Sequence, residues 1–183
     1  MSGNYPAATP IADVKGTTPD GLVSVNDLII TALPAEAGAY YAENSDRTQG
    51  IRIESTQTAA LGAKVTVTGT LTTDPLTHER YIKDAGFTSS TSDTAPKPLF
   101  MLCKDVGGAA LGTLIPAVPG TVGPHNTGLV VRIAGKVTAK DPSGSTYIWV
   151  NDGSVPGVGI KLDTSRLASA DVPGGKSLIF LED

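Results

Sequence analysis

The sequence has few of the residues from which catalytic and metal sites are usually built. Its 183 residues include one cysteine, two histidines and one tryptophan, and only 17% of them are charged. A single cysteine excludes an internal disulfide and a thiolate metal cage. No apolar run is long enough to cross a bilayer as a helix. The net charge of −4 argues against non-specific nucleic-acid binding, which depends on neutralising phosphates.

A signal peptide is also missing, since the first six residues contain neither a basic segment nor an apolar one. What the chain has instead is 22 threonines, 13 serines, 21 glycines and 13 prolines. Threonine favours strands, and threonine, glycine and proline all disfavour helices. Sparse lysine and glutamate beside abundant small polar residues is typical of secreted β-proteins. We therefore expect an extracellular or cell-surface protein whose export signal is absent from this chain.

Alternation of apolar and polar residues predicts a succession of strands. The clearest is Lys64–Leu71, which places valines and leucine on one face and threonines on the other. The expected strands are residues 22–32, 39–43, 50–54, 64–71, 79–83, 129–137, 146–150, 159–163 and 177–181. Residues 1–20 are expected to form an extended arm, in which residues 11–15 form either a short strand or one helical turn. Residues 88–98 are interpreted as a polar connector, with a short helix near 99–104.

The two halves of the chain match each other. Gly21-Leu22-Val23 corresponds to Gly128-Leu129-Val130 at an offset of 107 residues, which also aligns Tyr40 with Tyr147. The offset grows only in turns, so that GIRIES at 50–55 falls on GIKLDT at 159–164. A duplication shows this behaviour. Each half begins with a long strand and a three-strand meander, the order expected of a five-stranded OB barrel.

Three segments carry a resemblance to a known group of domains. GIRIES…AALGAKVTVTGTLTTD (50–74), GLVVRIAGKVTAKDPSGSTYIWVNDGS (128–154) and the connector PKPLFMLCKDVGG (96–108) resemble tandem OB-fold-like domains of secreted bacterial surface and accessory proteins. The resemblance implies secretion, an accessory or surface role and no catalytic residues. The predicted fold is all-β, with OB-like domains at 21–94 and 128–183, an arm at 1–20 and a Gly/Pro-rich connector at 95–127.

The second OB-like domain lacks its last strand within the chain, because the sequence stops soon after residues 177–181. Three explanations are open: truncation of the given chain, a connector that fills the gap, or a neighbouring subunit that donates a strand by β-augmentation. Under the last alternative the arm is the donor. The candidate assembly residues are Ile11, Val14, Leu178 and Phe180.

The search for chemistry finds no nucleophile motif, phosphate loop or metal-ligand spacing. His78 and His125 are interpreted as solvated loop residues, and Cys103 as a small buried hydrophobe. Asn151–Ser154 is interpreted as a hairpin turn. The basic residues Arg52, Arg80 and Lys83 are interleaved with Glu43, Glu54 and Glu79, which predicts a solvated mixed-charge face. The sequence predicts no enzyme, no cofactor and no metal.

Four aromatic residues are candidates for ligand binding, because OB barrels bind ligands on the face of strands 2 and 3. They are Tyr40, Tyr41, Tyr147 and Trp149. Adjacent Tyr40 and Tyr41 point to opposite faces, so at most one belongs to the core. The competing interpretation of all four is core packing or an interdomain contact.

Two functions follow from these patterns. The first is a non-catalytic extracellular structural subunit that assembles with copies of itself, as a filament or surface layer, through strand addition and β-domain packing. The alternative is an accessory module that binds an oligosaccharide, or less readily a single-stranded nucleic acid, on the strand 2–3 face. The expected partners are therefore copies of the chain or a carbohydrate.

Overall fold

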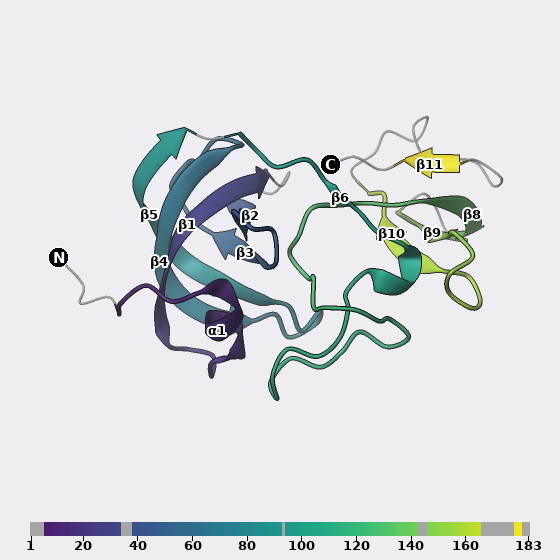
Figure 1. Ribbon diagram of the computed structural model, residues 1–183, viewed down its shortest axis with the longest axis horizontal. Coiled ribbons are helices and arrows are strands. Elements are labelled where there is room, and N and C mark those ends of the chain that lie inside the picture. Colours follow the sequence, from purple (N-terminus) through teal and green to yellow (C-terminus); the bar gives the residue numbers. More distant parts are fainter. Residues whose placement is uncertain (1–5, 34–37, 93, 143–145, 166–177, 181–183) are drawn as a thin grey trace.

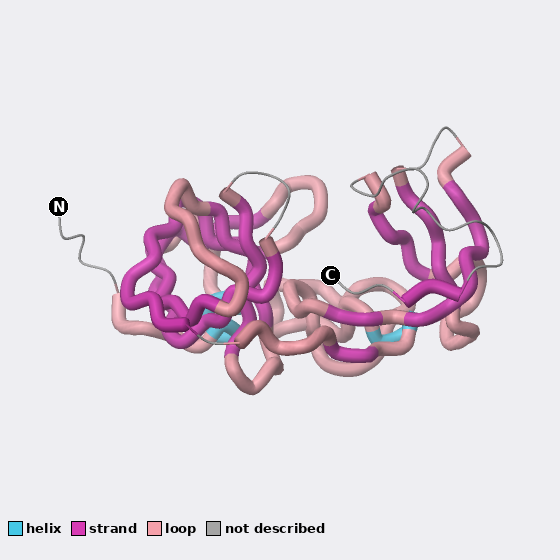
Figure 2. The backbone as a smooth tube through the Cα atoms, turned by 90° about the horizontal axis from the view of Figure 1, so that it is seen from above, coloured by secondary structure: helices cyan, strands magenta, loops and turns pink. Residues whose placement is uncertain are grey.

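Two β units lie at the two ends of the long axis of the molecule (Figures 1 and 2). The computed structural model describes residues 6–33, 38–92, 94–142, 146–165 and 178–180. The segment from about 94 to 130 runs between the two units. The chain is mostly β, as its composition predicts.

The first unit is a closed five-stranded barrel, consistent with an OB-like barrel. Its strand order is β1-β2-β3-β5-β4, with β3 and β5 parallel and every other pair antiparallel. The strands are β1 (Leu22–Ala32), β2 (Ala39–Asn44), β3 (Gly50–Glu54), β4 (Ala63–Thr73) and β5 (Arg80–Ser92). Strand β5 is longer than expected, because Thr88–Ser92 continue the pairing with β4 instead of beginning the connector. Inward-pointing aliphatic residues such as Ile51, Ile53 and Leu71 fill the barrel without exposed surface.

A short helix, α1 (Ile11–Gly16), lies against the barrel core. Ile11 and Val14 are 3% and 1% exposed and belong to the same core cluster as the barrel strands. The expectation of an extended arm is therefore wrong for these residues. Spacing of three places both side chains on one face of a helix, and the barrel core covers that face. Their apolar character is accounted for by packing within the chain, so no assembly role is assigned to them below.

The second unit is a four-stranded sheet with the order β10-β9-β8-β11. Its strands are β8 (Ala134–Lys140), β9 (Tyr147–Asn151), β10 (Ile160–Asp163) and β11 (Leu178–Phe180). A small core of Ile133, Val137, Ile148 and Val150 packs on one face. Within the described residues this sheet is open, with β10 and β11 at its edges. The side chains of Leu178 and Phe180 lie outside the described part of the chain.

The connector forms its own small elements. Strand β6 (Leu99–Phe100) pairs in parallel with β7 (Val131–Arg132), separately from the four-stranded sheet. A 3-10 helix, η1 (Cys103–Asp105), follows in place of the longer helix expected there. Cys103 is fully buried, as predicted, and burial raises the pKa of its thiol.

The connector is fixed to the barrel by backbone contact and by a buried carboxylate. A Cβ added at Gly50 would lie 2.0 Å from the Gly128 carbonyl oxygen, so the two backbones touch. The Val130 N–H donates a 2.6 Å hydrogen bond to Oε1 of Glu43, which is fully buried. Arg47 lies 3.4 Å from the other carboxylate oxygen. Paired and hydrogen-bonded in this way, Glu43 is tolerated in the interior.

Candidate functional site

An aromatic and cationic row crosses the outer surface of the barrel. Tyr41 on β2 pairs with Arg52 on β3, and Arg52 pairs with Tyr81 on β5. All three side chains are half-buried and alternate with fully buried core neighbours, so they point out of the barrel. The Arg52 guanidinium lies 4.7 Å from the centre of the Tyr81 ring, within cation–π range. The row lies on the strand 2–3 face, where OB barrels bind ligands.

Carboxylates surround the arginine in this row. Arg52 forms an ion pair with Glu54 and lies 3.6 Å from both Asp74 and Glu79. The Tyr41 hydroxyl donates a 3.3 Å hydrogen bond to Glu79. Burial raises the pKa of Glu79, while Arg52 and the Tyr41 hydroxyl partly offset that effect. The face therefore places one guanidinium group and three carboxylates, all able to form hydrogen bonds, beside the Tyr41 and Tyr81 rings. The mixed charge expected here is present.

The other tyrosine of the pair, Tyr40, points inward. It is 8% exposed, packs edge-on against Phe87 and donates a 3.0 Å hydrogen bond to the Gln57 carbonyl. The prediction that at most one of Tyr40 and Tyr41 lies in the core is confirmed. Tyr40 is therefore a core residue, whereas Tyr41 lies on the outer face of the barrel and donates a hydrogen bond to Glu79.

A matching group of side chains lies on the second sheet. Trp149 on β9 pairs with Lys161 on β10, and Tyr147 pairs with Asp163. The two aromatic rings meet edge to face, with their centres 4.8 Å apart. The Lys161 amino group lies 3.9 Å from the centre of the Tyr147 ring. Both rings are half-buried and alternate with the buried Ile148 and Val150, so they lie on one face of the sheet and point away from the core.

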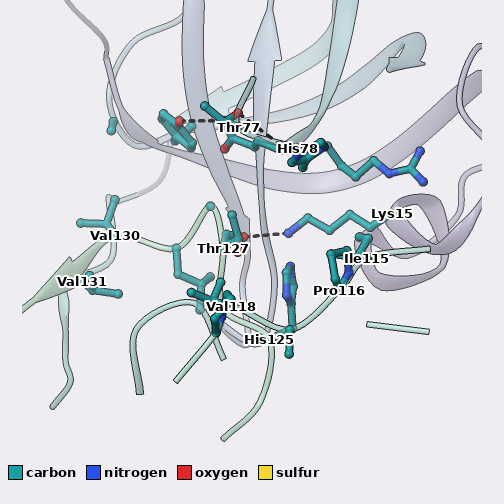
Figure 3. A pocket seen from close by; sticks show the side chains of 18 residues that line it. Lys15, Thr77, His78, Ile115, Pro116, Val118, His125, Thr127, Val130 and Val131 are labelled. Carbon is teal, nitrogen blue, oxygen red and sulfur yellow. Dashed lines mark hydrogen bonds between the residues drawn. The ribbon is translucent and has the colours of Figure 1, made fainter. Parts of the chain in front are cut away.

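A cavity of about 750 Å³ lies beside the aromatic row, between the barrel and the connector. The barrel contributes Lys15 from α1, the β4–β5 turn from Thr77 to Glu79, and Arg80 at the start of β5. The connector contributes Ile115–Pro119, His125 and Thr127, and the residues that follow it contribute Gly128–Val131. Figure 3 shows Lys15 reaching toward Thr127, whose carbonyl accepts its hydrogen bond at 2.7 Å, with the His125 ring beside it.

Three buried groups of this cavity are titratable. Lys15, Arg80 and His125 are 2%, 6% and 6% exposed. Burial lowers the pKa of Lys15 to about 8, although Glu79 opposes the change. Burial also lowers the pKa of His125, and the charge of Lys15 adds to the effect. His78 is exposed on the β4–β5 turn, as predicted, whereas the prediction of a solvated His125 is wrong, because its ring is buried where the connector lies against the barrel.

Lys15, Glu79 and His125 were not predicted as site residues, and Glu43 and Arg80 were expected on a solvated face. Each of the five is covered by residues distant in sequence, so local pattern carries no signal of its burial. The one sequence signal in this region is the length of the glycine- and proline-rich connector. It exceeds the ~12–15 residues beyond which loops without secondary structure are uncommon and are usually functional or disordered.

Within the described ranges, no group of three or more histidine, cysteine, aspartate or glutamate side chains is placed to hold a metal ion. In the same residues, no helix is long and apolar enough to span a membrane. Compared with known protein families, with curated proteins and with solved structures, the chain shows no match. Its function is therefore inferred from its own residues.

Proposed function

We propose that the chain is a non-catalytic binding module that holds an oligosaccharide on the outward aromatic faces of two OB-like units. The observation that carries the proposal is the recurrence of one arrangement. Tyr41 lies opposite Arg52 in the first unit, and Trp149 lies opposite Lys161 in the second. In both units an aromatic side chain therefore lies beside a cationic one on the corresponding pair of strands. These side chains point away from the core, so packing of the core does not require them.

The proposal includes a second OB-like unit, and strand pairing supports it. The β1–β2 register shifts between Ile30 and Ala32, and the β8–β9 register shifts between Val137 and Ala139, the residues 107 positions later. Ile53 pairs with Tyr40, whereas its counterpart Leu162 pairs with Ile148. Tyr41 therefore corresponds to Trp149. This differs by one residue from the alignment of Tyr40 with Tyr147 expected from sequence.

The correspondence between the two units also includes the short helices α1 and η1, which lie outside the domain boundaries predicted from the sequence. The sequence Asp13-Val14 in α1 matches Asp105-Val106 at the end of η1. Val14 packs in the barrel core and Val106 packs against the core of the second sheet. Each unit then begins with a helix before its first strand. The long loop at 107–128 stands where the first unit has only the short link 17–20.

An oligosaccharide fits these faces better than a single-stranded nucleic acid does. Sugar rings present C–H groups to aromatic faces and hydroxyls to carboxylates and guanidinium groups. Phosphates would meet Glu54, Asp74 and Glu79 around Arg52, in a chain whose net charge is −4.

Calorimetric titration of neutral and acidic oligosaccharides tests the proposal. We expect Tyr81→Ala and Trp149→Ala each to weaken binding roughly tenfold, equivalent to losing about 1.4 kcal/mol of stacking. Phe100→Ala is the matched control, because Phe100 is 62% exposed and lies on neither face. Equal loss in the control, or no binding across the panel, would contradict the proposal.

Self-assembly outside the cell is the second candidate. The observation in its favour is that β10 and β11 have no outer neighbour among the described strands, and such edges pair readily with another chain. Sedimentation velocity from micromolar to millimolar concentration tests it. Growth of the sedimentation coefficient with concentration is expected, whereas a constant monomeric value would exclude assembly by this chain alone.

A further inference from the structure

The cavity between the barrel and the connector has one polar side and one apolar side. The barrel side carries Lys15, Glu79 and Arg80, whereas the connector side carries Ile115, Pro116 and Val118. Figure 3 shows Lys15 and His125 close to the Ile115–Pro116 wall. At about 750 Å³ the cavity falls in the range of small-molecule sites.

The polar side holds two buried cations without a carboxylate partner. Neither Lys15 nor Arg80 forms an ion pair within the described residues. Nη1 of Arg80 is buried and has no hydrogen-bond partner there. Glu79, the nearby carboxylate, already contacts Arg52 at 3.6 Å and the Tyr41 hydroxyl at 3.3 Å. Buried charges are rarely left unpaired, so this pair of cations points to an anion that is bound from outside.

A second nitrogen of the residues that line the cavity is also buried without a hydrogen-bond partner among the described residues. Nδ1 of His125 is buried without a hydrogen-bond partner in the described part of the chain. The backbone beside His125 is closely packed, because a Cβ added at Gly108 would lie 1.9 Å from the Pro124 carbonyl oxygen and 3.0 Å from the Cα of His125. A ligand with a polar substituent would meet this nitrogen.

We infer that the cavity binds a small organic acid, whose carboxylate contacts Lys15 and Arg80 and whose apolar part lies against Ile115, Pro116 and Val118. A planar carboxylate matches the donor geometry of a guanidinium. The apolar wall favours an organic anion over an inorganic one. This site adjoins the aromatic face of the barrel, with which it shares Tyr41 and Glu79, but its two cations, Lys15 and Arg80, lie outside that face.

Binding should depend on pH through Lys15. The charged and titratable groups that line the cavity around it are Tyr41, His78, Glu79, Arg80 and His125. Lys15 is cationic below its pKa of about 8 and neutral above it. A bound carboxylate stabilises the cation, so complex formation near pH 8 should take up protons and the affinity should fall at higher pH.

Calorimetry on the full chain with acetate, hexanoate, benzoate and inorganic phosphate tests the inference. Hexanoate and benzoate should bind roughly tenfold or more tightly than acetate, because they bury more apolar surface. Proton uptake is read from heats in buffers of different ionisation enthalpy. Failure of every carboxylate to bind overturns the inference, and phosphate binding as tightly as hexanoate contradicts the apolar subsite.

Two variants assign the site. Arg80→Gln should weaken hexanoate binding roughly ten- to a hundredfold, as expected for loss of a charged hydrogen bond. Lys83→Gln, on the same strand, is the control because Lys83 lies outside the cavity. If Arg80→Gln does not fold, Lys15→Met serves in its place and should abolish the proton uptake. Unchanged affinity in the folded variant would refute the assignment.

Discussion

At the scale of single residues, the molecule is distinguished by charged side chains buried at the junction between barrel and connector. Glu43 is stabilised there by the Val130 N–H and Arg47. The Lys15 amino group donates a hydrogen bond to the Thr127 carbonyl, and burial lowers the pKa of Lys15. Buried charged residues of this kind lower the free energy of unfolding, and they also make the cavity polar. Binding sites commonly combine these two effects.

Replacement of Lys15 by methionine should stabilise the protein at pH 7. The pKa of Lys15 is about 8 in the folded protein, against an ordinary value of 10.5, so its burial costs on the order of 3 kcal/mol at neutral pH. Losing the hydrogen bond to Thr127 offsets about 1 kcal/mol of the gain. Urea denaturation measures the difference.

The sign of the pH dependence follows from the same values. Between pH 8 and pH 10.5 the unfolded chain binds more protons at Lys15, so the free energy of unfolding of the parent protein rises with pH. The difference between parent and Lys15→Met should therefore shrink as pH rises from 7 to 10. A pH-independent difference would show that the charge of Lys15 is not the cause.

At the scale of elements, strands were predictable wherever one face is buried and the other is exposed to solvent, because apolar and polar residues then alternate. The strand at Gly50–Glu54 has the predicted bounds, and the strand expected at 64–71 extends by a residue or two at each end. A helical turn was one of two alternatives for residues 11–15, because six residues with two apolar positions carry too weak a periodicity to separate a helix from a strand. The end of β5 was missed because serine and threonine suit connectors as well as strands.

The cavity was beyond prediction for a different reason. Lys15 and His125 are far apart in sequence, and both are buried only because the connector lies against the barrel. That contact depends on Gly50, the first residue of an expected strand, and on Gly128, which directly precedes another, and neither position carries a sequence signal of a contact between backbones. In the structure they are the positions at which two backbones meet.

Substitution of Gly128 by alanine should loosen this junction. Gly128 has φ +90°, and an added Cβ would lie 2.7 Å from the Gly50 carbonyl carbon. Gly123 is the matched control, with φ +84° and open space around it. Both variants lose about 1–2 kcal/mol through the left-handed backbone, and Gly128→Ala should lose more through the clash.

Amide hydrogen exchange of Val130 reports on the junction, because its N–H donates to Glu43. We expect faster exchange in Gly128→Ala than in Gly123→Ala. Equal exchange in the two variants would mean that the close approach does not hold the connector on the barrel.

At the scale of the whole molecule, two units of similar strand order are joined by a segment that is also the wall of a cavity. The loop at 107–128 has no counterpart of similar length in the first unit, and it supplies the apolar and histidine side of the cavity. The structure also accounts for the high content of threonine, glycine and proline. Threonine lies on outward faces such as that of β4, while glycine and proline build the loop.

The central claim, that the outward aromatic faces bind an oligosaccharide, is tested most directly by NMR mapping. The chain has one tryptophan, so its indole N–H resonance identifies Trp149 without further assignment. Titration with an oligosaccharide should shift this resonance, together with the amides of Tyr41, Arg52 and Tyr81. Shifts confined to residues away from both faces, or an unchanged spectrum across the panel, would contradict the account.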